Sequence, residues 1–243
     1  FNCGIVGLPN VGKSTLFNAL TSTVQAEAAN YPFCTIEPNS GRVAVPDNRL
    51  NKLTELSKSE KVVPAFLEIV DIAGLVRGAS KGEGLGNQFL GYIRQVDSVI
   101  ALLRCFEGGD ITHVEGSVDP IRDAETVETE LLLSDLESLE RRIEPLERKV
   151  KGGDKDDKAL YDVMSWVLEA LREGVPARNV EISSEERLYF KELSLITAKP
   201  VLYVCNVGED EAATGNAHSA RVVKKAAAEG AEAIVISAAI EGD

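Results

Sequence analysis

The sequence contains no long hydrophobic run. None of its apolar stretches approaches the roughly 20 residues that a membrane-spanning helix requires. No basic segment followed by an apolar one marks a signal peptide at the start. We therefore expect a cytoplasmic protein that makes no contact with a membrane.

Basic residues are too few to balance the acidic ones. The chain has 26 Lys and Arg against 39 Asp and Glu, a net charge of −13. Such a charge repels a bare phosphate backbone over most of the protein surface. Any contact with a nucleic acid must therefore be local.

Cysteine is also scarce and scattered. The four cysteines are far apart in the sequence, without the close pairs that zinc sites and redox dithiols use. We expect reduced thiols and no disulfide. These cysteines are Cys3, Cys34, Cys105 and Cys205.

Hydrophobic residues, by contrast, are plentiful at 44%, enough for a globular core. Short apolar runs alternate with helical stretches, a rhythm typical of an α/β fold with a mainly parallel sheet. The segment 41–46 is interpreted as one more strand, with an antiparallel direction as an option. The other predicted strands lie at 5–6, 66–70, 99–103, 201–205 and 233–236.

The middle of the chain has a different pattern. Apolar residues from Leu132 to Val150 recur every three or four positions, and the same stepping returns from Leu160 to Leu171 after the turn-like Gly152 and Gly153. This predicts two antiparallel helices, either part of the main core or a protruding arm. We favour a coiled-coil arm, because the strands on either side complete a sheet without it. The predicted domains are 1–121 with 196–243 for the main domain, which contains the sheet, and 122–195 for the helical insertion.

Residues 7–14 (GLPNVGKS) fit the phosphate-loop pattern G-x-x-x-x-G-K-[ST]. They follow a predicted strand and precede a predicted helix, which is the context that the motif requires. Backbone N–H groups and the helix N-terminus would face phosphates there. Lys13 would reach the β- and γ-phosphates, and the Ser14 hydroxyl would bind Mg²⁺.

A second motif, Asp71-Ile72-Ala73-Gly74, follows the predicted strand at 66–70. A carboxylate at the end of such a strand can orient Mg²⁺ through a water molecule, and the Gly74 N–H can meet a γ-phosphate. Thr35, in the loop between the two motifs, can offer Mg²⁺ another hydroxyl, although it can equally be an ordinary loop threonine. The predicted metal site is Ser14, Thr35 and Asp71.

These motifs, followed by 206–209 and Ser237-Ala238, stand in the order of the five motifs of TRAFAC-class GTPases. The run 71–86 resembles the Obg branch, and residues 31–39 (YPFCTIEPN) with the helical insertion resemble the YchF or Obg-like ATPase family. The resemblance implies a Ras-like nucleotide domain, the coiled-coil arm and a C-terminal TGS domain. That last domain is absent from this sequence, so we expect the chain to be part of a longer polypeptide.

The fourth motif reads Asn206-Val207-Gly208-Glu209, whereas guanine-specific domains have Asn-Lys-x-Asp. Val207 replaces the lysine whose aliphatic stem lies along the base. Glu209 carries one methylene more than the aspartate that pairs with guanine. The resemblance implies a preference for ATP over GTP. The predicted nucleotide-binding residues are Asn10, Val11, Gly12, Lys13, Ser14, Thr15, Asn206, Val207, Glu209, Ser237 and Ala238.

Leu75 occupies the place where Ras-type enzymes carry the glutamine that positions water. Because leucine cannot form a hydrogen bond, we expect slow intrinsic hydrolysis and another water-positioning group. His113 is one candidate, the alternative being a surface histidine. Asn10 resembles the asparagine of GTPases that hold K⁺ beside the β,γ-bridge, the alternative being an asparagine that bonds its own backbone. The predicted catalytic residues are Lys13, Thr35, Gly74 and His113.

The sequence thus predicts a switch ATPase that hydrolyses ATP to ADP and phosphate. The resemblance implies the ribosome or a ribosomal subunit as its partner, with RNA contacts through basic residues of the arm or through the TGS domain. The alternatives are an Obg-type GTPase of ribosome assembly and a scaffold whose nucleotide is structural. The basic residues of the arm, which could equally form a solvated face, are Arg141, Arg142, Arg148, Lys149 and Lys151.

Overall fold

The computed structural model describes residues 1–28, 40–72, 85–107 and 117–242. Within this part of the chain, six strands form one sheet in the order β2-β3-β1-β4-β5-β6. All neighbours are parallel except β2 and β3, so the carboxyl ends of the other strands meet at one edge. The strands are β1 (Asn2–Val6), β2 (Ser40–Ala44), β3 (Phe66–Asp71), β4 (Ser98–Arg104), β5 (Val201–Asn206) and β6 (Glu232–Ile236).

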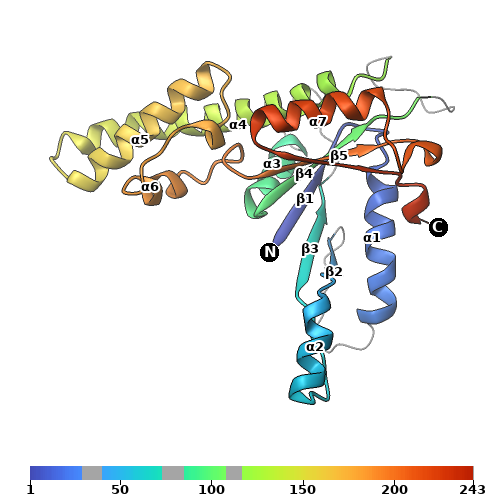
Figure 1. The fold of residues 1–243 in the computed structure, drawn as a ribbon. Helices are drawn as coiled ribbons and strands as arrows, with labels where there is room; N and C mark the ends of the chain where they lie inside the picture. The colour runs from blue at the N-terminus through green and yellow to red at the C-terminus, as the bar shows by residue number, and fades with distance from the viewer. Residues whose placement is uncertain (29–39, 73–84, 108–116, 243) are drawn as a thin grey trace.

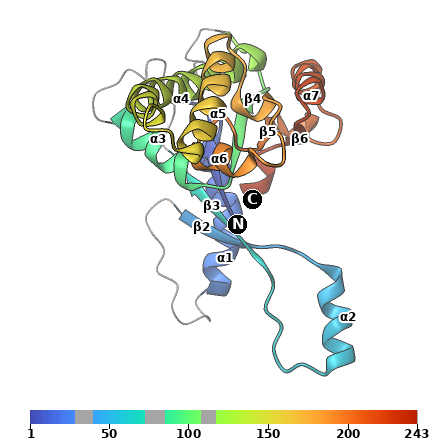
Figure 2. The same ribbon diagram turned by 90° about the vertical axis from the view of Figure 1, so that its left-hand side faces the viewer.

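The predicted α/β fold is therefore confirmed, including the strand at 41–46, which is β2 and runs antiparallel to β3. Continuous apolar runs give strands that are buried on both faces, as β1 and β4 show. The sheet carries α1 on one side and α4 with α7 on the other (Figures 1 and 2). The α-helices are α1 (Lys13–Ala28), α2 (Asn48–Ser57), α3 (Leu85–Gln95), α4 (Pro120–Val150), α5 (Lys155–Arg172), α6 (Arg187–Glu192) and α7 (Ala217–Glu229).

Helices α4 and α5 form the predicted antiparallel arm, which extends away from the sheet in Figure 1. Each begins at an aspartate whose side chain accepts backbone N–H bonds: Asp119 caps α4 and Asp154 caps α5. The arm has its own apolar core, separate from that of the sheet. That second core includes Leu132, Leu139, Leu146, Val163, Met164, Val167 and Leu171.

Helix α4 belongs to both cores. Ala124, Val127 and Leu131 pack into the core of the sheet, and the arm core begins at Leu132. The boundary at residue 122 remains a prediction, and one continuous helix, α4, runs through it. The apolar face of the arm thus continues from the core of the sheet.

One buried carboxylate anchors the arm to the chain that returns from it. Asp135 on α4 is fully buried and accepts hydrogen bonds from Ile196 N at 3.0 Å, Thr197 N at 2.7 Å and Thr197 Oγ1 at 2.8 Å. Arg94, in the last turn of α3, lies 3.6 Å from the same carboxylate. These contacts hold the base of the arm against the sheet domain.

Helix α2, which the sequence pattern did not reveal, projects from the β2–β3 connection at the end of the molecule opposite α7 (Figure 1). None of its residues is buried, and Leu53 and Leu56 are 58% and 82% exposed. Asp47 caps its N-terminus, and Lys58 ends it in a left-handed conformation. Among the helices that the structure describes, α2 included, none is long and apolar enough to cross a membrane.

Candidate functional site

The phosphate loop connects β1 to α1 at the carboxyl edge of the sheet. Its apolar residues Leu8 and Val11 are buried and anchor the loop to the protein interior. Asn10 and Gly12 have positive φ angles of 65° and 92°, which curl the chain back before α1 begins at Lys13. The first N–H groups of α1 have no partner within the helix and are available to an anion.

Lys13 and Asp71, predicted from separate motifs, lie in contact. Lys13 Nζ donates to Asp71 Oδ1 at 2.5 Å and to the carbonyl oxygen of Ile72 at 2.8 Å. Parallel pairing places Asp71 beside Ile5 at the end of β1, so both motifs reach the same edge of the sheet. The structure thereby brings together the lysine predicted to bind phosphates and the carboxylate predicted to orient the metal.

The residues at this edge suit Mg²⁺. The Ser14 hydroxyl and the Asp71 carboxylate are hard oxygen donors, and Mg²⁺ commonly keeps several waters while it binds one or two such groups and the substrate phosphates. Within the described residues, no group of three or more His, Cys, Asp or Glu side chains could hold a metal alone. Ser14 and Asp71 suit a metal whose remaining ligands are waters and phosphate oxygens.

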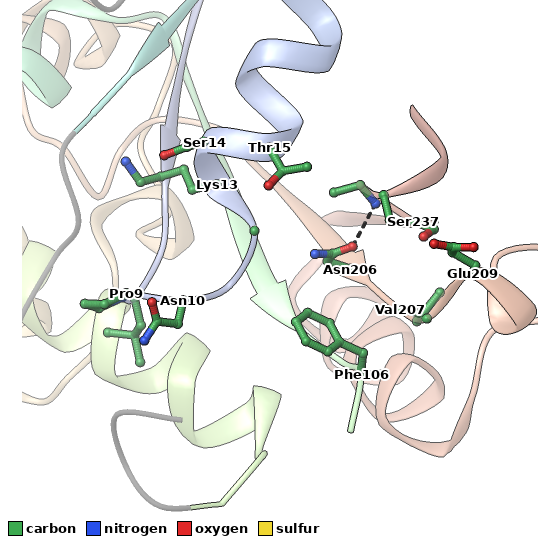
Figure 3. Close-up of a pocket in the computed structure, with 15 residues that line it drawn as sticks. Pro9, Asn10, Lys13, Ser14, Thr15, Phe106, Asn206, Val207, Glu209 and Ser237 are labelled. Atoms are coloured by element: carbon green, nitrogen blue, oxygen red, sulfur yellow. Dashed lines mark hydrogen bonds between the residues drawn. The ribbon is translucent and has the colours of Figure 1, made fainter. Parts of the chain in front are cut away.

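Asn206, the last residue of β5, joins two loops of the site. Its Nδ2 donates to the Val11 carbonyl oxygen at 2.9 Å, and its Oδ1 accepts from Ala238 N at 2.9 Å (Figure 3). Ser237 and Ala238 directly follow β6 and are buried. The Ser237 hydroxyl has no hydrogen-bond partner within the described chain. Asn206 thus fixes the phosphate loop against the segment after β6.

These segments enclose one pocket of about 840 Å³. Figure 3 shows Lys13, Ser14 and Thr15 at the start of α1, while Phe106, Val207 and Glu209 lie along other walls. The volume and shape suit a nucleotide, with phosphates at one end and a base at the other. The lining residues are Leu8, Pro9, Asn10, Gly12, Lys13, Ser14, Thr15, Phe106, Asn206, Val207, Gly208, Glu209, Ser237, Ala238 and Ala239.

Phe106 is a pocket residue that sequence reasoning missed. It lies just beyond β4 at the carboxyl edge of the sheet, a position where ligand-binding residues gather in parallel α/β folds. Arg104 holds the ring from behind, with its guanidinium carbon 4.4 Å from the ring centroid and its Nε donating to the Phe106 carbonyl oxygen at 3.3 Å. The ring therefore forms a fixed apolar wall.

Two cysteines lie behind this wall. Cys105 and Cys205 are fully buried and precede Phe106 and Asn206 in the sequence. The hydrogen bond with the Cys205 thiol, together with burial, raises the pKa of Cys105 above its ordinary value. Cys105 therefore stays a neutral thiol and acts as packing.

Other predicted residues lie outside the described part of the chain, at an exposed position of the pocket wall or on the arm. Thr35, Gly74 and His113 lie outside the described residues. Glu209 is exposed at the start of a short 3-10 helix (Glu209–Glu211). On the arm, Arg142 donates to the Leu193 carbonyl oxygen, and Arg141 and Arg148 pair with glutamates one helical turn earlier.

The chain resembles known proteins over its whole length. Residues 2–142 match the family model described as 50S ribosome-binding GTPase. The chain is 54% identical over 242 residues to the ribosome-binding ATPase YchF of Bacillus subtilis (strain 168), covering 99% of this chain and 66% of that protein. For the ribosome-binding ATPase YchF of Escherichia coli O157:H7, the identity is 50% over 243 residues, covering 100% and 66%.

A solved structure is also similar to this chain over its whole length. The Schizosaccharomyces pombe YchF GTPase superimposes with a TM-score of 0.85 at 40% identity, covering 100% of this chain and 66% of that chain. The present chain thus spans just under two thirds of the length of these relatives.

Proposed function

The chain belongs to the 50S ribosome-binding GTPase family and to the YchF proteins within it, and from this premise we propose that it is a switch ATPase. It binds ATP with Mg²⁺, binds GTP more weakly, and hydrolyses ATP slowly to ADP and phosphate. The observation that carries this proposal is the pocket that Lys13 lines at one end and Asn206 at the other, with Asp71 in contact with Lys13.

The base end of the pocket favours adenine. Ala238 N–H, a donor that could meet the 6-oxygen of guanine, is already bonded to Asn206 Oδ1. Asn206 retains one amide hydrogen and one lone pair, which match the N7 acceptor and the 6-amino donor of adenine. Val207 is buried and brings no cation to the base. The hydroxyl of Ser237 offers one further unpaired contact in this wall.

Hydrolysis relies on charge and position. Ser14 and Asp71 would hold Mg²⁺, which would neutralise charge on the β- and γ-phosphates. Lys13 must leave Asp71 to reach those phosphates, and Ser14 holds its hydroxyl at the same end. Thr35 and Gly74 would complete the phosphate end, and His113 would orient the attacking water. With Leu75 in place of a polar residue, we expect a low intrinsic rate.

Asn10 supports a role for K⁺. Its left-handed backbone holds it on the phosphate loop, where it lines the pocket. An amide oxygen there can help to hold a monovalent cation beside the β,γ-bridge, and that positive charge can take the place of an arginine finger.

The partner we propose is the ribosome or a ribosomal subunit, in the cytoplasm, because the bacterial relatives are named ribosome-binding proteins. The net charge of −13 confines RNA contacts to small areas of this chain. On the arm, Lys149 and Lys151 remain exposed for such contacts, whereas Arg142 bonds backbone carbonyl groups. A C-terminal TGS domain would provide a second RNA-binding surface.

A second candidate is an Obg-type GTPase that acts in ribosome assembly. The observation in its favour is Glu209, which keeps a carboxylate in the fourth motif and lines the pocket. The Schizosaccharomyces pombe relative is also named a GTPase. The two candidates differ in the base that binds more tightly.

The proposed activity is tested by phosphate release from ATP under single-turnover conditions, with Mg²⁺ and the purified chain. We expect slow release that disappears in Lys13→Ala and persists in Lys58→Ala, a control at an exposed lysine that ends α2. Release at the same rate in Lys13→Ala would refute hydrolysis in this pocket.

A further inference from the structure

Asn216 occupies the N-cap of α7 and has every hydrogen-bonding group of its side chain in use. Its Oδ1 accepts a hydrogen bond from Ser219 N at 3.0 Å, while the backbone N–H of Asn216 donates to Ser219 Oγ at 2.8 Å. This reciprocal pair is a capping box, which fixes the first turn of the helix. The side chain therefore has one well-defined orientation.

The amide nitrogen of Asn216 reaches two other segments. Nδ2 donates to the Cys105 carbonyl oxygen at 2.6 Å and to Glu211 Oε2 at 2.7 Å. A side-chain amide has two N–H donors, so both are satisfied here. One side chain thus joins the end of β4, the turn after β5 and the start of α7.

The two segments carry different parts of the base end of the pocket. Cys105 is followed by Phe106, and Glu211 ends the 3-10 helix Glu209–Glu211, which continues the Val207–Glu209 turn. Asn216 itself does not line the pocket. Its side-chain amide instead contacts residues that adjoin both parts of the pocket wall.

The same turn of α7 adds a second link to the Phe106 segment. His218 Nε2 lies 3.0 Å from Glu107 Oε1. The residues on both sides of Phe106 are therefore held by the first turn of α7, Cys105 through Asn216 and Glu107 through His218.

We propose that Asn216 is a positioning residue: it fixes the spacing between Phe106 and the Val207–Glu209 turn and so determines how much the base contributes to nucleotide affinity. The inference rests on the proposed function, because it requires the base to lie between those walls. Contacts between an aromatic wall and a flat base weaken steeply with sub-ångström gaps, so a small change in spacing reduces affinity for the base and leaves the phosphate end intact.

The alternative is that Asn216 only caps the helix. Asn216→Asp separates the two roles. Aspartate is an equally good N-cap, and its charge suits a helix N-terminus. It cannot donate, however, so it loses both links and faces the Glu211 carboxylate. Asn216→Ser also keeps a cap, but it is too short for either link and adds no charge.

The test compares equilibrium dissociation constants of ATP and of inorganic tripolyphosphate, both with Mg²⁺. The dissociation constant of tripolyphosphate divided by that of ATP isolates the contribution of the nucleoside. For Asn216→Asp and Asn216→Ser we expect this ratio to fall about tenfold, roughly 1.4 kcal/mol, while tripolyphosphate affinity stays unchanged. Asn51→Asp, the same replacement at an exposed site on α2, should match the wild type.

A rescue variant adds a measurement whose result would not change if Asn216 had only a structural role. In the double variant N216D/E211Q, the amide and carboxylate change places, so the link to the turn after β5 can form again. We expect the double variant to recover part of the ratio that N216D loses. A double variant with the same ratio as N216D would contradict the Glu211 link.

A ratio unchanged in both single variants, or equal losses for ATP and tripolyphosphate, would overturn the inference. Failure of the proposed function looks different, because the wild type would then bind ATP no more tightly than tripolyphosphate.

Discussion

Gly12 lies so close to the side-chain amide of Asn206 that a Cβ atom at Gly12 would be 2.4 Å from Asn206 Nδ2. The same Nδ2 donates to Val11 O, so the phosphate loop and the end of β5 fit together without spare space. Gly12 therefore meets two requirements. It adopts a φ of 92°, and it leaves room for the asparagine that joins the loops.

Replacement of Gly12 by alanine should disable the pocket. The methyl group would displace Asn206. It would also strain the backbone, because residues that carry a side chain rarely adopt a positive φ of this size. We expect ATP affinity to fall by at least about tenfold, about 1.4 kcal/mol, as measured by equilibrium titration. Gly153→Ala is the matched control, since Gly153 has a φ of 86° and no atom within 4 Å of the added carbon. Similar ATP binding in both variants would contradict the role of Asn206.

The Lys13–Asp71 contact leads to a prediction about Mg²⁺. In Asp71→Asn, the water-mediated metal contact is weakened and Lys13 loses its charged partner. We expect the gain in ATP affinity on adding Mg²⁺ to fall about tenfold, while affinity measured in EDTA does not decrease. Asp162→Asn, at an ion-paired position on the arm, should keep the wild-type Mg²⁺ dependence. An Mg²⁺ response that survives in Asp71→Asn would remove Asp71 from the metal site.

Sequence reasoning predicted the sheet well, because the strands read as short apolar runs. The antiparallel edge strand β2 and the helical arm also appear where they were predicted. Lys13, Ser14, Asn206, Ser237 and Ala238 come together because parallel strands deliver their motifs to a single edge.

Other features could not be read from the sequence because they depend on tertiary contacts. Helix α2 has leucines that face solvent, so its pattern does not describe a core face. Phe106 belongs to no motif, and only pairing of β4 with β5 places it beside Val207. The two cores that share α4 likewise follow from packing, since a heptad seam does not indicate which partner it meets.

The anchor of the arm can be tested through stability. Asp135→Asn leaves an amide facing backbone N–H donors and removes the charge near Arg94. We expect the free energy of unfolding to fall by about 2–3 kcal/mol, which lowers Tm by roughly 5–10 °C for a chain of this size. Differential scanning calorimetry measures the shift, with Asp162→Asn as the exposed control. Equal Tm values for the two variants would show that the buried carboxylate does not hold the arm.

The proposed K⁺ site predicts a difference between two salts. With Asn10 intact, single-turnover hydrolysis of ATP should be about tenfold faster in K⁺ than in Na⁺, because a positioned cation stabilises charge on the β,γ-bridge. Asn10→Ala should erase this difference, and Asn51→Ala should preserve it. Equal wild-type rates in the two salts at the same ionic strength would eliminate the site.

The central claim is that this pocket selects adenine through Asn206 and a fourth motif that lacks lysine and aspartate. Equilibrium competition between ATP and GTP, with Mg²⁺ and one fluorescent nucleotide on the purified chain, tests it most directly. We predict that ATP binds at least about tenfold more tightly, a difference of roughly 1.4 kcal/mol. Tighter binding of GTP would contradict the claim and favour the Obg-type GTPase instead.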